Sequence, residues 1–239
     1  MLRKLCETNR ARLVENLRQR ADVARGVVLL KGHRPVPQLD ATSTHPHMHF
    51  EANFTYLFGA QHYFYDGLLF LDDCRAFLLS DFPADDHAHT RLSAETARAE
   101  FGVERIVGTA QLPKLLREIG AQRVFLHCGC DGYTARASNA YDHPVLETLE
   151  LPIDRETLYP VLNNTRVVKS ELELEAMERV CRASSQGHEE VMRRCRPGMT
   201  EHQLGALFFD AVSRLGEAGD WAYWPICCSG ADCAVLHYH

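Results

Sequence analysis

The stretch "TRVVKSELELEAMERVCRASSQGHEEVMRRCRPGMTEHQL" (165–204) contains two helix starts. Ser170 and Glu173 have the spacing of a capping box, in which the hydroxyl accepts from a free backbone N–H and the carboxylate reaches back to the cap residue. Thr200 and Gln203 repeat this spacing after a Pro-Gly break. Apolar residues follow both boxes at helical intervals. The stretch therefore predicts two helices joined by a short turn.

The helix pair extends over 170–216, and strands are expected after it, near 221–227 and 234–238. Two helices can cover a sheet, but this segment offers only two strands to be covered. A module of this size buries too little apolar surface to offset the entropy of its chain. We therefore interpret 161–239 as the opening of a larger α/β domain.

Upstream of the pair, helical and strand patterns alternate. Helices are expected over 2–20, from Ser93 onward, and over 112–120. Strands are expected at 27–30, 53–59, 67–73, 75–81 and 123–129. Such alternation is typical of an α/β fold. The first 160 residues therefore predict a separate N-terminal α/β domain.

Composition disfavours several classes of protein. The net charge of -6 does not suit nucleic-acid binding, which usually needs a basic face. The apolar runs, such as 27–30, are far shorter than the roughly 20 residues of a membrane helix, and the charged start is not typical of a secretory signal. Nine scattered cysteines indicate free thiols in a reducing compartment. We expect a cytoplasmic protein with neither a nucleic-acid nor a membrane partner.

Some motifs have the residue types of a metal site but not its spacing. "CGC" at 128–130 and "CC" at 227–228 lack the C-x₂-C spacing of a tetrahedral zinc site. "HPHMHF" (45–50) has three alternating histidines, but no carboxylate or thiolate has matching spacing, so we favour a solvated loop. His188, within the first helix of the pair, fits a partly exposed helical position better than a functional one. No structural zinc site is expected.

Several segments carry a resemblance to a known family. Residues 165–204 are similar to the start of the catalytic domain of Xaa-Pro dipeptidases (prolidases), and "PICCSGADCAVLHYH" (225–239) resembles the family form I-C-G-S-G-x-x-x-A-V-L-H-Y-G-H. "NRARLVENL", "VVLLKG", "FTYLFGA" and "FLLSDFPA" resemble successive pieces of the prolidase N-terminal domain. The chain is thereby similar to the prolidase branch of the pita-bread metallopeptidase superfamily.

The resemblance implies a fold, a reaction and a site. It implies a mixed-sheet, creatinase/prolidase-type α/β domain over 1–160 and the first two helices and strands of an incomplete pita-bread domain over 161–239. Proteins of this family hydrolyse dipeptides that end in proline, use two divalent metal ions, often manganese, and are usually cytosolic homodimers. His237 matches a family histidine that contacts the substrate or the reaction intermediate. It is the catalytic and substrate-binding residue that the resemblance implies.

The sequence also departs from the family pattern. The family's five metal ligands lie after the His-Tyr-Gly-His stretch, so we expect no metal ligand in this chain and no activity from the chain alone. Cys228 stands at a family glycine, and His239 follows Tyr238 where the family has glycine. We interpret the chain as the N-terminal piece of an Xaa-Pro dipeptidase. Two alternatives stay open: a non-catalytic peptide- or protein-binding relative of the same fold, and an aminopeptidase P.

Overall fold

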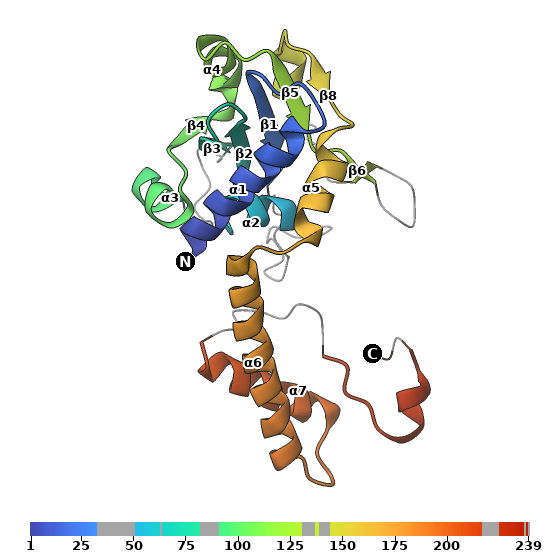
Figure 1. Ribbon diagram of the computed structural model, residues 1–239. Helices are drawn as coiled ribbons and strands as arrows, with labels where there is room; N and C mark the ends of the chain where they lie inside the picture. Colours follow the sequence, from blue (N-terminus) through green and yellow to red (C-terminus); the bar gives the residue numbers. More distant parts are fainter. Residues whose placement is uncertain are drawn as a thin grey trace, which may run out of the picture. The chain divides into compact units, whose positions relative to one another are not determined.

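The computed structural model describes residues 1–32, 51–62, 64–81, 91–130, 137–138, 144–216, 225–236 and 238. The chain divides into two compact units, Met1–Val168 and Lys169–His239, and each is described by itself. Figure 1 shows the elements of both units in chain order. None of the helices in the described ranges is both long and apolar enough to span a membrane.

The first unit alternates helices and strands. Its helices are α1 (Leu2–Arg18), α2 (Ala52–Phe58), α3 (Ala94–Phe101), α4 (Leu112–Glu118) and α5 (Leu158–Val167), with the short 3₁₀ helices η1 (Thr109–Gln111) and η2 (Pro144–Thr148). Its strands are β1 (Gly26–Leu30), β2 (Tyr65–Phe70), β3 (Ala76–Ser80), β4 (Arg105–Gly108), β5 (Arg123–Leu126), β6 (Gly129–Cys130), β7 (Ala137–Ser138) and β8 (Ile153–Asp154).

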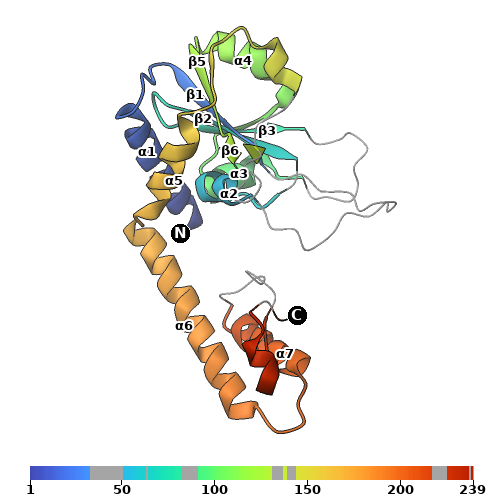
Figure 2. The same cartoon turned by 90° about the vertical axis from the view of Figure 1, so that its right-hand side faces the viewer.

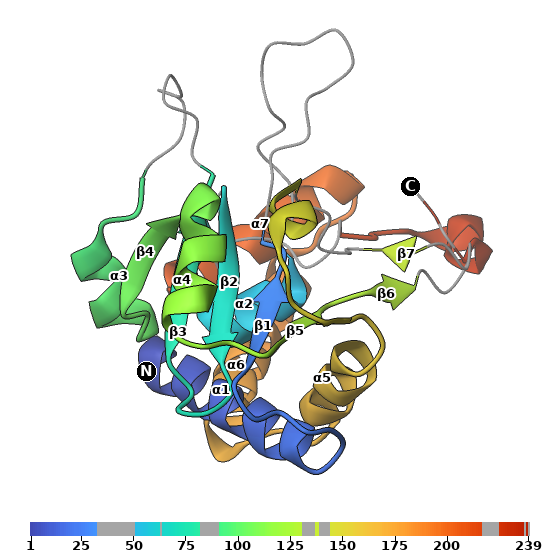
Figure 3. The same ribbon diagram turned by 90° about the horizontal axis from the view of Figure 1, so that it is seen from above.

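Six strands form one mixed sheet in the order β4-β3-β2-β1-β5-β8. Strand β2 is antiparallel to both of its neighbours, whereas the pairs β3–β4, β1–β5 and β5–β8 are parallel. Figure 3 shows β4, β3, β2, β1 and β5 side by side. Every residue of β1 is buried, as expected for a strand covered on both faces. The mixed sheet that the resemblance implies is therefore present.

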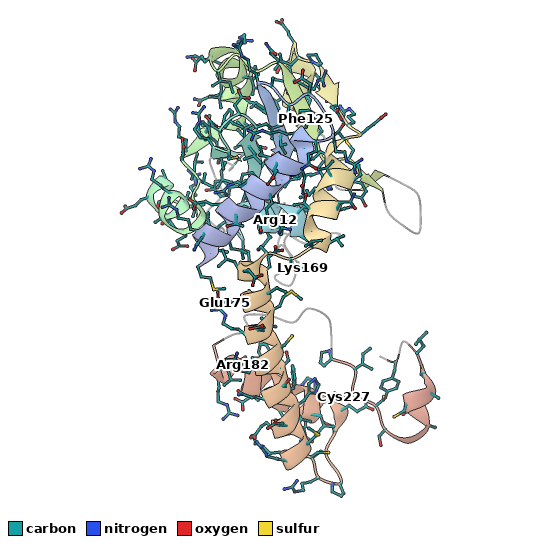
Figure 4. All side chains as sticks on the ribbon, viewed as in Figure 1. Arg12, Phe125, Lys169, Glu175, Arg182 and Cys227 are labelled. Atoms are coloured by element: carbon teal, nitrogen blue, oxygen red, sulfur yellow. The ribbon has the colours of Figure 1, made fainter. Side chains whose placement is uncertain are left out.

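Helices cover both faces of this sheet (Figure 2). Helices α1, α2, α3 and α5 bury their apolar residues on one face, against Val28 of β1 and Phe125 of β5. Helix α4 and η2 cover the other face, against Val27 and Leu29. Phe125 is labelled in Figure 4. Successive strand residues point to opposite faces, so β1 contributes to both cores, and the α/β class predicted from the sequence is confirmed.

Arginines of α1 bind the carboxyl ends of neighbouring helices. Arg10 is 2% exposed and donates to the carbonyl oxygens of Leu57 (2.8 Å), at the end of α2, and of Phe101 and Gly102 (3.1 to 3.2 Å), at the end of α3. Arg12, labelled in Figure 4, donates to carbonyls at the end of α5. The last carbonyls of a helix lack partners within it and carry the negative end of its dipole. Helix α1 thus fixes the ends of three other helices.

The second unit contains α6 (Glu171–Arg194), α7 (Glu201–Arg214) and the 3₁₀ helix η3 (Gly230–Ala234). Both predicted capping boxes are confirmed: each cap hydroxyl accepts from the backbone three residues on, and each Glu173 or Gln203 side chain accepts from the cap N–H. Gly187 lies where α6 meets α7, because a Cβ there would come within 2.9 Å of the Phe208 ring. The absence of a side chain at Gly187 allows this close approach.

The prediction of a strand at 53–59 is wrong, because this segment forms helix α2. The Glu51 carboxylate accepts from the backbone N–H of Phe54 and caps the first turn. Gly59 takes the left-handed conformation (φ +69°) that ends helices. Phe54, Leu57 and Phe58 all turn toward the core, at spacings of three and four residues, so helical periodicity overrides the strand preference of the aromatic residues.

The expected strands after α7 are not formed by the described residues. Residues 225–229 have no regular structure, and η3 follows where the second strand was expected to begin. Val235 and Leu236 are 52% and 86% exposed. A strand needs a hydrogen-bonded neighbour, and the described part of the second unit contains only helices. Residues 221–224, the start of the first expected strand, lie outside the described residues.

The two units divide after Val168, whereas the sequence placed the division after residue 160. Helix α5 crosses that point and buries Leu158, Val161 and Leu162 in the core of the first unit. It therefore belongs to the first unit. The interpretation of the second unit as the start of a larger domain stays a prediction.

Candidate functional site

The candidate site lies in the tail that follows α7, where the sequence places His237. Residues 225–236 and 238 of this tail are described, whereas His237 and His239 are not, so their side chains have no assigned position. A Cβ on Gly205 of α7 would lie 3.2 Å from the Pro225 ring. The tail therefore starts in contact with α7.

Tyr238, the neighbour of His237, is held by Glu201 in the first turn of α7. The Tyr238 hydroxyl lies 2.9 and 3.1 Å from the two Glu201 carboxylate oxygens and donates to this carboxylate. The hydrogen bond to Glu201, which favours the protonated phenol, raises the pKa of Tyr238. Pro225 and Tyr238, at the two ends of the described part of the tail, thus both contact α7.

Glu201 is a residue that the sequence analysis did not single out. It follows the cap residue Thr200, where an acidic side chain ordinarily serves the positive end of the helix dipole. That position predicts that Glu201 stabilises the start of α7, but it does not predict the hydrogen bond to Tyr238. The bond could have been expected only from a sequence argument that brings the tail back to the start of α7.

Three cysteines accompany these residues. Cys227 is half-buried, and Cys228 and Cys233 are exposed. Burial, with the nearby Glu201 carboxylate as a smaller cause, raises the pKa of Cys227. Burial and this carboxylate therefore disfavour the thiolate of Cys227, and the thiolate is the form of cysteine that binds metals and acts as a nucleophile.

The described residues do not form a metal site. In the ranges that the structure describes, no three His, Cys, Asp or Glu side chains come together so that they could hold a metal ion. Cys128, Cys227 and Cys228 belong to no such group within the described residues. "HPHMHF" (45–50) lies outside the described residues. His188 is exposed and packs against the Phe208 ring of α7, with 4.8 Å between ring centroids.

A second, partly buried polar cluster lies in the first unit, beside the carboxyl end of β5. The Arg166 guanidinium donates to the Asn53 side-chain oxygen at 2.5 Å, which leaves the Asn53 amide group to donate to His127 Nε2 at 3.1 Å. The Tyr159 ring lies against the imidazole, with 5.3 Å between centroids. The cluster joins α2 and α5 to the end of β5. The sequence analysis missed it because its members come from three distant segments.

Comparison with known proteins relates most of the second unit to a family. Residues 175–239 match the model of "Metallopeptidase family M24". This segment is similar to the M24 metallopeptidases. The match covers α6, α7 and the whole tail, which includes the stretch that carries His237, Tyr238 and the cysteines.

Curated relatives extend the similarity to both units. The chain is 27% identical to the mouse Xaa-Pro dipeptidase over 234 residues, which is 96% of this chain and 47% of the relative. It is 26% identical to the human Xaa-Pro dipeptidase over 233 residues, again 96% of this chain and 47% of the relative. The chain thus spans about half the length of these M24-type relatives.

Solved structures share the fold. A putative aminopeptidase P from Bacillus anthracis matches 90% of this chain and 52% of its own, with a TM-score of 0.66 and 18% identity. Zinc-substituted aminopeptidase P from Escherichia coli, in complex with product, matches 90% of this chain and 50% of its own, with a TM-score of 0.63 and 22% identity. The predicted resemblance to pita-bread peptidases and the predicted fold class are confirmed, and the family is one of metal-dependent peptidases.

Proposed function

We propose that the natural protein is an Xaa-Pro dipeptidase, which hydrolyses dipeptides with a C-terminal proline. The observation that carries this proposal is the alignment of mouse and human Xaa-Pro dipeptidases over 96% of the chain, across both units. In this proposal, 1–168 is the N-terminal domain and 169–239 is the start of the catalytic domain.

The competing activity is that of aminopeptidase P, the protein in the solved structures that share the fold. These structures are at most 22% identical to this chain, so they support its fold and not its activity. Curated fungal Xaa-Pro aminopeptidases reach 36% identity, but over only 46% of this chain. The longer alignment with the dipeptidases supports dipeptidase activity. The two activities differ in the length of the peptide that is cleaved.

The chain's own contribution to the reaction is His237. By its resemblance to the family, its imidazole contacts the substrate carbonyl or the intermediate, where a hydrogen-bond donor stabilises negative charge that develops in the transition state. Glu201 acts as a positioning residue, because it holds Tyr238 directly beside His237. The family's two divalent metal ions, in our proposal manganese, are bound by residues that the described part of this chain does not supply.

The same reasoning gives three further proposals. We infer that residues 1–239 alone have no peptidase activity, because the resemblance places all five metal ligands after the His237–Tyr238 stretch. We also infer that the protein acts in the cytoplasm, which suits its many free cysteines, and that it forms a homodimer, as the family usually does.

The test is His237→Ala in the natural gene product, assayed with an Xaa-Pro dipeptide. The site role predicts a fall in kcat of about 10²- to 10³-fold, with bound metal and melting temperature unchanged. A histidine that only packs in the core predicts normal kcat with about 1–3 kcal/mol less stability from an unpaired buried partner. A parallel assay with a tripeptide Xaa-Pro-Xaa separates the two activities: cleavage of the tripeptide alone would replace the dipeptidase by an aminopeptidase P.

A further inference from the structure

Cys228 and Cys233 flank a tight turn in the tail. Ser229 is extended (φ -143°, ψ 148°), Gly230 has a positive φ of 62°, and η3 then coils through Ala234. The Val235 N–H donates to the Asp232 carbonyl at 3.0 Å and closes the turn. As a result, Cys228 and Cys233 lie on the two sides of one turn, and their side chains interact. Both thiols are exposed, so a small oxidant can reach them.

We propose that Cys228 and Cys233 form a redox modification site, which closes an intramolecular disulfide when the protein meets a peroxide or a small-molecule disulfide. Each thiol loses its proton and one electron, and a sulfur–sulfur bond forms. With hydrogen peroxide as the oxidant, its oxygen–oxygen bond breaks and two waters leave. With glutathione disulfide, two glutathione thiols are released by exchange through a mixed disulfide.

The structure selects this pair among the neighbouring cysteines. Cys227 directly precedes Cys228, and consecutive Cα atoms are about 3.8 Å apart, which is shorter than the roughly 4.4–6.8 Å that a disulfide usually spans. Cys227 is also less exposed than its two neighbours. Cys181 and Cys195 both lie on or at the end of α6, and at 1.5 Å per residue their separation along the helix is about 20 Å, so they cannot bridge to each other.

The surroundings of Cys228 make this thiol slow to react. The hydrogen bond to Cys233 is the main cause that raises the pKa of Cys228, and the carboxylates of Glu201 and Asp232 add to the effect. Because the thiolate is the attacking species, a raised pKa lowers the rate of oxidation at neutral pH. The Cys228 thiol therefore lacks the lowered pKa of a catalytic thiol.

Peptide mapping tests the pairing without any assay of activity. No Lys or Arg follows Arg214, so all three tail cysteines fall in one tryptic piece, 215–239. Cleavage before Asp220 and Asp232 separates Cys227 and Cys228 from Cys233. After treatment of the folded chain with glutathione disulfide, we expect the pieces 220–231 and 232–239 to be linked, and to separate when dithiothreitol is added.

Variants identify the sulfurs that form the bond. Cys227→Ser should keep the link, whereas Cys228→Ser and Cys233→Ser should each abolish it. Cys181→Ser is the matched control, since it removes an exposed thiol elsewhere in the same unit. Persistence of the link in Cys228→Ser would overturn the pairing in favour of Cys227. Glutathione adducts on single tail cysteines, with no linked pieces in the folded chain, would overturn the site itself.

Discussion

Arg10 offers a sharp test of how the first unit is held together. Its guanidinium is the partner of carbonyls at the ends of both α2 and α3, and its side chain is almost fully buried. We consider Arg10→Met, which keeps most of the stem's apolar contacts and removes every donor. Burial lowers the pKa of Arg10, but the guanidinium stays charged at neutral pH, so charge-assisted bonds are lost.

The magnitude follows from the acceptors left behind. The bonds to Leu57 and Phe101 are buried, whereas the one to Gly102 is partly accessible to water. Each buried carbonyl without a donor costs about 1–3 kcal/mol, and relief from holding a cation in the interior offsets part of that. The net expected loss is about 3–4 kcal/mol. For a unit of this size, about 2–4 °C per kcal/mol makes the drop in melting temperature roughly 10 °C.

Arg3→Met is the matched control. Arg3 lies on the same helix and forms an exposed pair with Glu7 (2.8 Å; side chains 52% and 44% exposed), which is worth less than about 1 kcal/mol. Urea unfolding of the two variants and the parent measures the difference. Equal losses in Arg10→Met and Arg3→Met would refute the idea that the buried guanidinium fixes the ends of α2 and α3.

Three further predictions concern the second unit and the thiols. Gly187→Ala should gain up to about 1 kcal/mol of helix propensity but lose about 1–3 kcal/mol from the clash with Phe208, so thermal unfolding of the second unit should occur at lower temperature; an unchanged or raised midpoint would contradict the close approach of α6 and α7. Ser170→Ala should cost about 1 kcal/mol and reduce protection from hydrogen exchange in the first turn of α6, whereas full protection would mean that the cap is dispensable. Burial raises the pKa of Cys6 to about 11, so a thiol reagent at pH 8 should label exposed Cys181 rapidly and Cys6 only after unfolding; rapid labelling of Cys6 in the folded chain would disprove its burial.

Local signals in the sequence were enough to predict much of this fold. The capping boxes at Ser170 and Thr200 act within a single turn, so four letters of sequence define each helix start. The strands β2 and β3 were likewise predicted from two apolar runs, at 67–73 and 75–81. Where the decisive interaction is local, a single sequence is sufficient.

The sequence was misleading where a distant partner decides the structure. "FTYLF" (54–58) has strand-forming residues, and besides the local Glu51 cap and Gly59 its helix depends on burial of one side against distant core residues. "AVLHY" (234–238) has a strand-like composition, but a strand also requires a neighbour to pair with. The hydrogen bonds of Arg10 to the ends of α2 and α3 join residues far apart in the chain. No periodic pattern in the sequence predicts them.

The candidate site was predicted in part. The motif around His237 directed attention to the tail, and the M24 match covers this stretch. The role of His237 stays a prediction, because its position is not described. Glu201 was missed since its partner Tyr238 is separated from it by α7 and most of the tail. Contacts of this kind depend on tertiary structure rather than on spacing.

The most direct test of the central proposal is an assay of the natural gene product for hydrolysis of a Gly-Pro-type dipeptide, with manganese and after removal of metal by a chelator. The proposal predicts release of free proline with manganese, loss of that activity with the chelator and recovery when manganese returns. Residues 1–239 alone, assayed in parallel, should release none. A full-length protein that is folded and metal-loaded yet cleaves no Xaa-Pro bond would contradict the proposal and favour a non-catalytic, peptide-binding relative of the fold.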